Sequence, residues 1–260
     1  MLIVNRLDKK EVLDLISKEK LKRIFLDIDY TVLTTGKGTD ETVNILNKIY
    51  PKLGDTADYI YKIILESKAN FENMDKERQN EFLEIKNNFE EYQKDLKVLK
   101  IWSRESIIME AAKRLNLKLS AKKIDEIADK YWQIVAELTE FYDDAIPLLD
   151  RIKKEKIPIT WVTGSDSSLK LEEVNGEIKS IYDWEYSWKN KEKRLKILTN
   201  RYPGKLMIGD PIDKPELWNK LLDKEILKEK EKHLVIGDSK NDDLVVAESL
   251  GIKTILIKRK

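Results

Sequence analysis

Residues 23–33 have the sequence RIFLDIDYTVL, in which an apolar run ends at two aspartates one residue apart. Residues 24–26 are typical of a strand that is buried on both faces, as in a parallel sheet. Asp27 and Asp29 would lie at its carboxyl end, where open α/β sheets place their ligands. Because side chains at i and i+2 of a strand share a face, the two carboxylates need a cation between them, or one must be protonated. An oxygen-seeking ion such as Mg²⁺ meets this need, although a polar turn after a strand has the same pattern.

The composition restricts the class of protein. The 260 residues allow one large domain or two modest ones, and a hydrophobic content of 41% permits a sizeable core. Lys and Arg number 49 and Asp and Glu 48, so the formal net charge of +1 gives no general attraction to nucleic acid or to an anionic membrane. The absence of cysteine excludes disulfides, thiolate catalysis and cysteine-held metals. Residues 1–8 lack the apolar core of a signal peptide and no long apolar run follows, so we expect a cytoplasmic protein.

Strands and helices alternate at both ends of the chain. A short amphipathic helix is predicted over residues 8–20, before the first strand. Four further strand candidates are rich in aliphatic residues and lie at 157–163, 205–208, 233–236 and 254–257. This alternation predicts an α/β fold with a Rossmann-like, doubly wound parallel sheet. We expect the core to comprise residues 1–33 and 142–260.

Residues 34–141 have a different character, because helical periodicity dominates and glycine nearly disappears. The clearest helix is predicted over 121–141 with Ser120 as its N-cap, and a more polar one over 75–98. We therefore expect an all-helical domain inserted after the first strand and joined to it by a mobile loop at residues 36–38. Some of its side chains could contact a ligand, although aromatic residues at helical spacing more often belong to a core; these are Tyr59, Tyr61, Trp102, Arg104 and Trp132.

Two later segments could contact a phosphate group. The strand at 157–163 ends in Thr163 and Gly164, which offer a hydroxyl and exposed backbone amides, although a plain turn would have the same residues. Lys214 precedes Pro215, whose fixed φ suits the first turn of a helix. A lysine that pairs with both a carboxylate and a phosphate would offset the repulsion between them.

Four motifs in this order resemble those of the haloacid dehalogenase (HAD) superfamily, whose members are mostly phosphatases. The first is Asp-x-Asp-x-Thr at residues 27–31, the second is the strand ending at Thr163, and the third is the pair 214–215. The fourth begins with Asp238, which follows the strand at 233–236 and precedes two further acids. The resemblance covers the core, and the insert lies where the helical C1 caps of that superfamily lie.

The resemblance implies a role for each of these residues. Asp27 would attack phosphorus and form an aspartyl-phosphate, while Asp29 would protonate the leaving alcohol and then activate water. Mg²⁺ would be held by Asp27, by the backbone carbonyl of Asp29 and by Asp238. The phosphate oxygens would be held by Thr163, by Lys214 and by backbone amides near Gly164.

The superfamily places a second acid of the fourth motif either four or five residues after Asp238, which leaves Asp242 and Asp243. Adjacent residues of a helix point about 100° apart, so only one of them can face the metal. Gly251 is the expected C′ residue of the helix, thirteen positions after Asp238, and this length favours Asp243. We expect Asp243 to support the metal through water or Lys214, and Asp242 to cap the helix.

The leading functional prediction is a Mg²⁺-dependent phosphatase acting on a small phosphorylated metabolite, with no nucleic-acid or membrane partner. A sugar phosphomutase on the same scaffold is one alternative, and a binding or regulatory module that uses the helical insert is another. Asp29 favours phosphate esters, because haloacid dehalogenases lack this second acid. The chain departs from the usual pattern through its added N-terminal helix and through Tyr30, which replaces a commoner glycine and could narrow access to the site. His233 opens a strand and is expected to be structural.

Overall fold

The computed structural model describes residues 1–210 and 214–259, which form two compact units. Unit 1 contains residues 1–35, 139–165 and the chain from 195 onward, and unit 2 contains residues 36–138 and 166–194. The predicted boundaries differ from these units mainly in the segment 166–194, which the sequence assigned to the core. This segment groups with unit 2 because its hairpin packs on helices of the insert.

The sheet of unit 1 has six strands among the described residues, and all of its pairings are parallel. Its strands, in spatial order, are β1 (Leu2–Val4), β10 (Lys253–Ile257), β9 (His233–Gly237), β2 (Arg23–Asp27), β5 (Ile159–Gly164) and β8 (Lys205–Gly209). The five strands predicted from aliphatic runs are all present. β1 was not predicted, because three residues are too few to show a pattern; it pairs with β10 at the edge.

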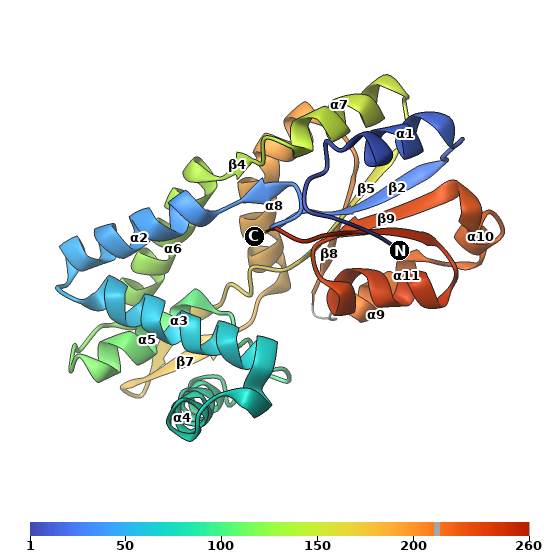
Figure 1. Ribbon diagram of the computed structural model, residues 1–260. Coiled ribbons are helices and arrows are strands. Elements are labelled where there is room, and N and C mark those ends of the chain that lie inside the picture. The colour runs from blue at the N-terminus through green and yellow to red at the C-terminus, as the bar shows by residue number, and fades with distance from the viewer. Residues whose placement is uncertain (211–213, 260) are drawn as a thin grey trace. The chain divides into compact units, whose positions relative to one another are not determined.

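Side chains of β2 alternate between two cores, as expected for a doubly wound sheet. Ile24 and Leu26 belong to one core, and Phe25 between them belongs to the other. Figure 1 shows α1 (Lys10–Lys18) and α7 (Ala145–Lys154) on one face of the sheet. It shows α9 (Lys214–Leu221) and α11 (Val245–Ser249) on the other face. The short helix α10 (Lys224–Leu227) lies between them in the sequence. The predicted N-terminal helix is therefore α1, which packs beside α7.

Unit 2 is built mainly from helices. They are α2 (Gly36–Ile49), α3 (Leu53–Asn70), α4 (Lys76–Tyr92), α5 (Arg104–Arg114) and α6 (Ala121–Leu138), with a 3₁₀ turn over Phe71–Asn73. The predicted helices at 75–98 and 121–141 correspond to α4 and α6. Ser120 caps α6, since its Oγ accepts a hydrogen bond from the N–H of Lys123 at 3.2 Å. Their apolar faces enclose one core, in which Ile60, Phe89 and Ile107 are buried.

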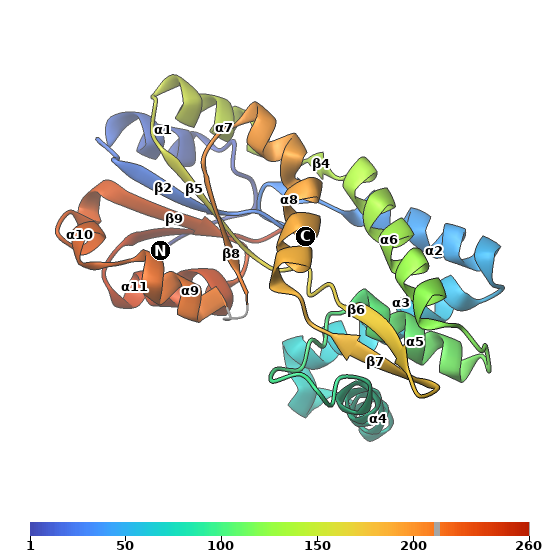
Figure 2. The same cartoon turned by 180° about the vertical axis from the view of Figure 1, so that it is seen from behind.

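A β-hairpin completes unit 2 and was not predicted. It consists of β6 (Lys170–Val174) and β7 (Glu177–Ile181), and it leads into α8 (Trp184–Arg201), whose last residues belong to unit 1. β6 contacts α6 and β7 contacts α4, as Figure 2 shows from behind. The strands carry many charged residues, so they lack the aliphatic runs that mark the other strands. A further two-stranded ribbon pairs β3 (Leu33–Thr34) with β4 (Glu140–Phe141).

The predicted mobile loop at residues 36–38 is wrong, because these residues form the first turn of α2. Gly38 is buried, and a Cβ placed on it would lie 2.9 Å from the Cα of Val135 in α6. Gly54 has the same role between α3 and α2, where a Cβ would lie 2.1 Å from the carbonyl oxygen of Val43. Glycine therefore serves here to bring helices close together, which a sequence pattern cannot distinguish from flexibility.

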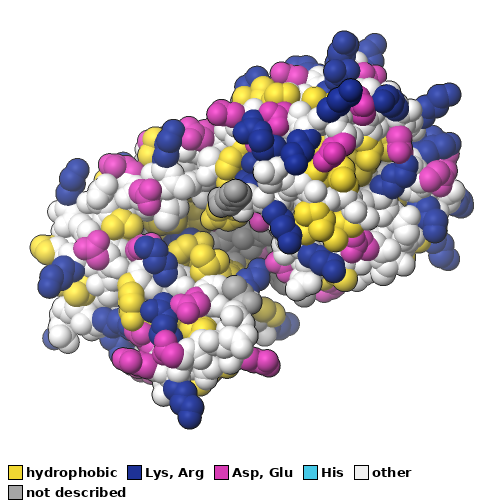
Figure 3. Space-filling model, in the orientation of Figure 1, with side chains coloured by type: hydrophobic (Ala, Val, Ile, Leu, Met, Phe, Trp, Pro, Cys, Tyr) yellow, Lys and Arg dark blue, Asp and Glu magenta, His cyan; other side chains and the backbone are white. Residues whose placement is uncertain are grey.

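Charged side chains of both signs are interspersed on the face of each unit seen in Figure 3. This agrees with the nearly equal numbers of basic and acidic residues in the sequence. None of the helices in the described ranges is long and apolar enough to cross a membrane.

Candidate active site

Asp27 is the last residue of β2, and its side chain is only 1% exposed. Its two carboxylate oxygens have different partners. Oδ1 lies 2.5 Å from Nζ of Lys214, and Oδ2 accepts a hydrogen bond of 2.6 Å from Oγ1 of Thr31. Lys214 is the first residue of α9, as the Lys-Pro pair predicted. These contacts hold the Asp27 carboxylate in one orientation at the carboxyl edge of the sheet.

The loop after β2 turns sharply at Tyr30, which has a φ of 61°. This left-handed conformation favours glycine, so a tyrosine here carries some backbone strain. Arg259 stabilises the turn, because its Nε donates to the Tyr30 carbonyl at 2.9 Å and its Nη2 donates to the Thr31 carbonyl at 2.5 Å. The arginine is itself held by Asp144 at 2.8 Å. The Tyr30 side chain is 48% exposed.

Three carboxylates of unit 1 form a cluster that could hold a metal ion. Asp27 ends β2, Asp238 follows β9, and Asp243 lies in a π-helical turn over Lys240–Leu244. One carboxylate oxygen from each lies within 4.8 Å of the others. Oxygen ligands at this spacing suit a hard divalent cation such as Mg²⁺.

Asp243 reaches the cluster because Gly237 lacks a side chain. A Cβ on Gly237 would lie 2.5 Å from the Cβ of Asp243, so any other residue would push Asp243 away. Asp243 is fully buried, accepts a hydrogen bond from the backbone N–H of Ser239 at 3.0 Å, and lies 2.5 Å from Nζ of Lys214. The structure thus places Asp243, five residues after Asp238, beside Asp27 and Lys214.

The predicted capping role of Asp242 is wrong. Ser239 caps this turn instead, since its Oγ accepts a hydrogen bond from the N–H of Asp242 at 3.2 Å. The π-helical turn begins at Lys240, so Ser239 is the N-cap residue and Asp242 lies inside the turn. Gly251 has a φ of 76° just after α11, which confirms its predicted place as the C′ residue.

Asp29 and Thr163 are neighbours at the ends of β2 and β5. The Oγ1 of Thr163 lies 3.3 Å from Oδ2 of Asp29, to which it can donate a hydrogen bond. The Asp29 side chain is partly buried and lies outside the three-carboxylate cluster. Gly164 follows Thr163, and no atom of the described residues lies within 4 Å of the place where its Cβ would be.

The electrostatics of the cluster favour a further cation. Burial lowers the pKa of Lys214, but the adjacent Asp27 and Asp243 outweigh it and raise this pKa above its usual value. Burial, followed by the charge of Asp27, raises the pKa of both Asp238 and Asp243. One lysine therefore does not neutralise three carboxylates, and a divalent cation would stabilise their ionised forms.

Sequence reasoning missed two groups that position this site. Ser239 donates its backbone N–H to Asp243 and caps the π turn, and Arg259 holds the Thr31 carbonyl. Thr31 was part of the first motif, but its hydrogen bond to Asp27 was not predicted.

His233 is buried at the start of β9, 6.2 Å from the Phe25 ring, and burial lowers its pKa. It occupies the opposite end of β9 from Asp238.

Comparisons with solved structures show which proteins have the same fold. YfnB from Bacillus subtilis, classed as a HAD-hydrolase and solved with magnesium bound, is 14% identical with a TM-score of 0.53 over 91% of this chain and 88% of its own. A protein from Thermotoga maritima classed as a β-phosphoglucomutase is 17% identical, with a TM-score of 0.52, and the match covers 90% of this chain and 84% of that protein. A 2-haloacid dehalogenase from Pseudomonas syringae is 15% identical, with a TM-score of 0.50, and the match covers 91% of this chain and 86% of that protein.

No protein-family model and no curated protein matches the sequence. The likeness is therefore one of fold, and the chemistry must be argued from the residues of this site.

Proposed function

We propose that this chain, which has the fold of the HAD-like hydrolases, is a Mg²⁺-dependent phosphatase that hydrolyses a small phosphate monoester. One observation carries the proposal. Asp27 is buried, is oriented by Thr31 and Lys214, and lies within 4.8 Å of the carboxylates of Asp238 and Asp243. A fixed carboxylate next to a cation and a metal-binding cluster is what nucleophilic attack on a phosphate requires.

The residues of the cluster fit Mg²⁺, with Asp27 and Asp238 as its carboxylate ligands and the Asp29 carbonyl as a third. Asp243 would act mainly through Lys214, since their atoms lie 2.5 Å apart. When bound, Mg²⁺ would offset the negative charge on the transferred phosphoryl group. Thr163, Lys214 and the amides near Gly164 would bind the phosphate oxygens.

The reaction would proceed in two steps. An oxygen of Asp27 would form a bond to phosphorus while the bond from phosphorus to the leaving oxygen breaks, and Asp29 would give its proton to that oxygen. Asp29, now ionised, would take a proton from water, which attacks phosphorus and releases Asp27 and inorganic phosphate. The Thr163 hydroxyl, 3.3 Å from Asp29, would hold the acid in place between the two steps.

The helical insert would act as a C1-type cap that selects the leaving group. In this proposal unit 2 carries the residues that distinguish substrates, and unit 1 carries the chemistry. A sugar phosphomutase remains an alternative on the same scaffold, and it would return phosphate to another position of the sugar rather than release it. Asp29 argues against dehalogenation, which needs no second acid.

The test is phosphate release from p-nitrophenyl phosphate with Mg²⁺ and with excess EDTA. We expect turnover only with Mg²⁺, and a loss of at least about 1,000-fold in Asp27→Asn, whose amide is a poor nucleophile. Asp14→Asn is the matched control, because Asp14 lies on α1 and pairs with Lys18 at the surface. Full activity of Asp27→Asn, or equal activity in EDTA, would disprove the proposal.

A further inference from the structure

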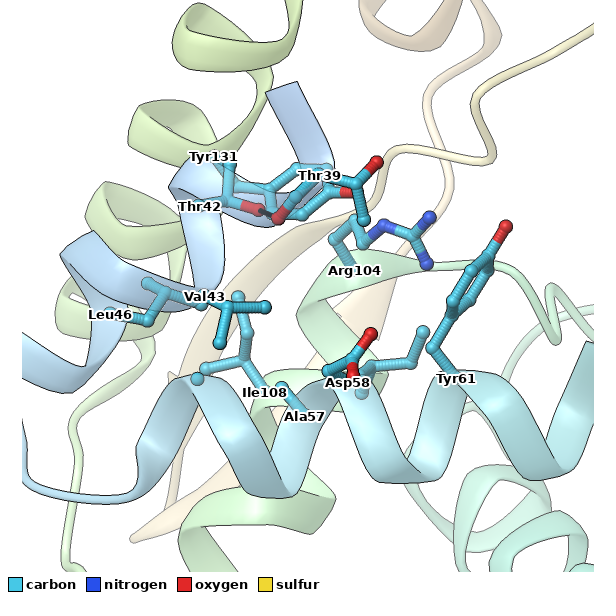
Figure 4. A pocket seen from close by; sticks show the side chains of 12 residues that line it. Thr39, Thr42, Val43, Leu46, Ala57, Asp58, Tyr61, Arg104, Ile108 and Tyr131 are labelled. Carbon is cyan, nitrogen blue, oxygen red and sulfur yellow. Dashed lines mark hydrogen bonds between the residues drawn. The ribbon is translucent and has the colours of Figure 1, made fainter. Parts of the chain in front are cut away.

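Unit 2 contains an arginine that is surrounded by aromatic rings. Arg104 is the first residue of α5, and its Cζ lies 4.3 Å from the ring centroid of Tyr61, 4.9 Å from that of Tyr131 and 5.6 Å from that of Trp132. Tyr61 comes from α3 and the other two from α6. Figure 4 shows the guanidinium between Tyr61 and Tyr131.

Arg104 differs from the other arginines of unit 2 in having no carboxylate partner among the described residues. Arg78 pairs with Glu66 at 2.7 Å, and Arg114 pairs with Glu81 at 2.6 Å. By contrast, Nε and Nη1 of Arg104 are buried without any hydrogen-bond acceptor. Aromatic rings compensate a buried cation only in part, at about 0.5–2 kcal/mol each. An anion beside the guanidinium would stabilise it further.

Arg104 lines a narrow pocket that is open to solvent on one side. Most of its wall is apolar, and the hydroxyl-bearing side chains lie at the same end as Arg104 in Figure 4. The lining residues come from α2, α3, α5 and α6, and its apolar part includes Val43, Leu46 and Ile108. The pocket therefore joins one cationic group to a narrow apolar space.

The lining also limits the charge of a ligand. Asp58 faces the pocket, and the exposed Lys62 at 2.6 Å offsets its negative charge only in part, so Asp58 would disfavour a second negative group on the ligand. A phosphate dianion or a dicarboxylate would meet this repulsion, and neither would use the apolar wall. A monocarboxylate would place one charge against Arg104 and a short hydrocarbon chain against residues such as Leu46 and Ile108.

We propose that this pocket of unit 2 binds a small organic monocarboxylate, with Arg104 as the residue that recognises the carboxylate. The inference goes beyond the proposed phosphatase activity and does not depend on it. A protein without phosphatase activity could still bind a carboxylate here, and a phosphatase could lack this site.

The test follows the side-chain Nε–H signal of Arg104 by NMR in the full chain labelled with ¹⁵N-arginine, assigned through its loss in Arg104→Lys. Propionate is the probe, with sodium chloride at equal ionic strength, succinate and inorganic phosphate as comparisons. We expect a saturable shift of the Arg104 signal with propionate, because its Nε–H gains an acceptor. Succinate and phosphate should bind more weakly, and chloride should give no saturable shift.

Two variants and a control complete the test. Arg104→Met should weaken propionate binding by about 10- to 100-fold, the loss expected for hydrogen bonds to a charged group. Val43→Phe keeps the arginine but fills the pocket, so it should abolish binding even if Arg104→Met does not fold. Arg78→Met should leave binding unchanged, since Arg78 lies near the Tyr59 ring but pairs with Glu66. An unshifted Arg104 signal, phosphate binding as tight as propionate binding, or full binding by Val43→Phe would overturn the proposal.

Discussion

In unit 1, the ammonium of Lys214 lies 2.5 Å from a carboxylate oxygen of Asp27 and 2.5 Å from one of Asp243. In unit 2, Glu105 is 1% exposed and its Oε2 accepts a hydrogen bond from Ser103. Its Oε1 and two nitrogens of the neighbouring Arg104 are buried without a hydrogen-bond partner among the described residues. Charges of the first kind hold one another in a fixed arrangement, whereas those of the second kind are costly to bury. Unit 1 thus holds its buried charges in pairs, and unit 2 retains polar groups that a bound molecule could satisfy.

The largest effect is expected from Lys214→Met, which removes the cation shared by two buried carboxylates. We expect the free energy of unfolding in EDTA to fall by about 3–5 kcal/mol, as when one partner of a buried ion pair is lost. Mg²⁺ should restore part of this loss, because it supplies positive charge to the same cluster. Urea unfolding with EDTA and with Mg²⁺ measures both effects.

Lys220→Met is the matched control for this variant. Lys220 lies on the same helix, is largely exposed and pairs with Glu216 at 2.9 Å. Its loss should change stability by less than about 0.5 kcal/mol, as is usual at surface positions. An equal loss of stability in both variants would show that the charges of the cluster do not depend on Lys214.

Glu105 should show the opposite behaviour, because burial disfavours its charge more than the 2.6 Å hydrogen bond from the Ser103 hydroxyl stabilises it. Burial raises its pKa to about 7, so the folded protein keeps a proton that the unfolded chain releases above its usual value of about 4.3. Stability should therefore be highest below that value and decrease as the pH rises to about 7. Glu105→Gln cannot ionise and should be more stable than the native protein by about 3 kcal/mol at pH 8, with no gain at pH 4.

Glu110 provides the control on the same helix. It is equally buried but accepts hydrogen bonds from Asn88, Tyr92 and Arg114 at 2.9–3.0 Å. Glu110→Gln should lower stability at pH 8, since it leaves Arg114 with a weaker partner. Thermal unfolding across pH 4–8 checks the pair, and a gain in stability from both variants would remove the distinction between compensated and uncompensated glutamates.

A smaller effect is expected from glycine substitutions in unit 1. Gly237→Ala would push Asp243 away from the cluster and should cost about 1–3 kcal/mol, as in other overpacked sites, and weaken Mg²⁺ binding. Gly164→Ala adds a methyl group where none of the described residues has an atom within 4 Å, so stability should change by less than about 0.5 kcal/mol. Urea unfolding and a Mg²⁺ titration of both variants measure the difference. Equal effects would contradict the role given to Gly237.

The sheet and the main residues of the candidate site could be predicted because local signals mark them. Aliphatic runs show the strands of unit 1, and Asp27, Asp238 and Lys214 lie directly at element ends. Counting to Gly251 even favoured Asp243, which the structure places beside Lys214. These features depend on residues close together in the sequence.

The remaining features depend on contacts between distant residues. The sequence could not show whether Gly38 serves as a hinge or allows two helices to pack closely. The atom that leaves no room for a side chain there is in the backbone of Val135, in another helix. Ser239 rather than Asp242 is the cap because the π-helical turn already begins at Lys240. Arg104 was a possible ligand contact from its residue type alone. The aromatic rings around it could not be predicted, because they come from α3 and α6, which pack against α5 only in the folded protein.

The most direct test of the central claim is to trap the phosphoryl group on Asp27. In Asp29→Asn the water that hydrolyses the intermediate is no longer activated, and p-nitrophenyl phosphate needs no acid to release its leaving group. Acid quenching followed by mass spectrometry should then find one phosphoryl group on Asp27, and none when Asp27→Asn is added. Phosphate release by the native chain with no phosphoryl group on Asp27, or with one on another residue, would contradict the account.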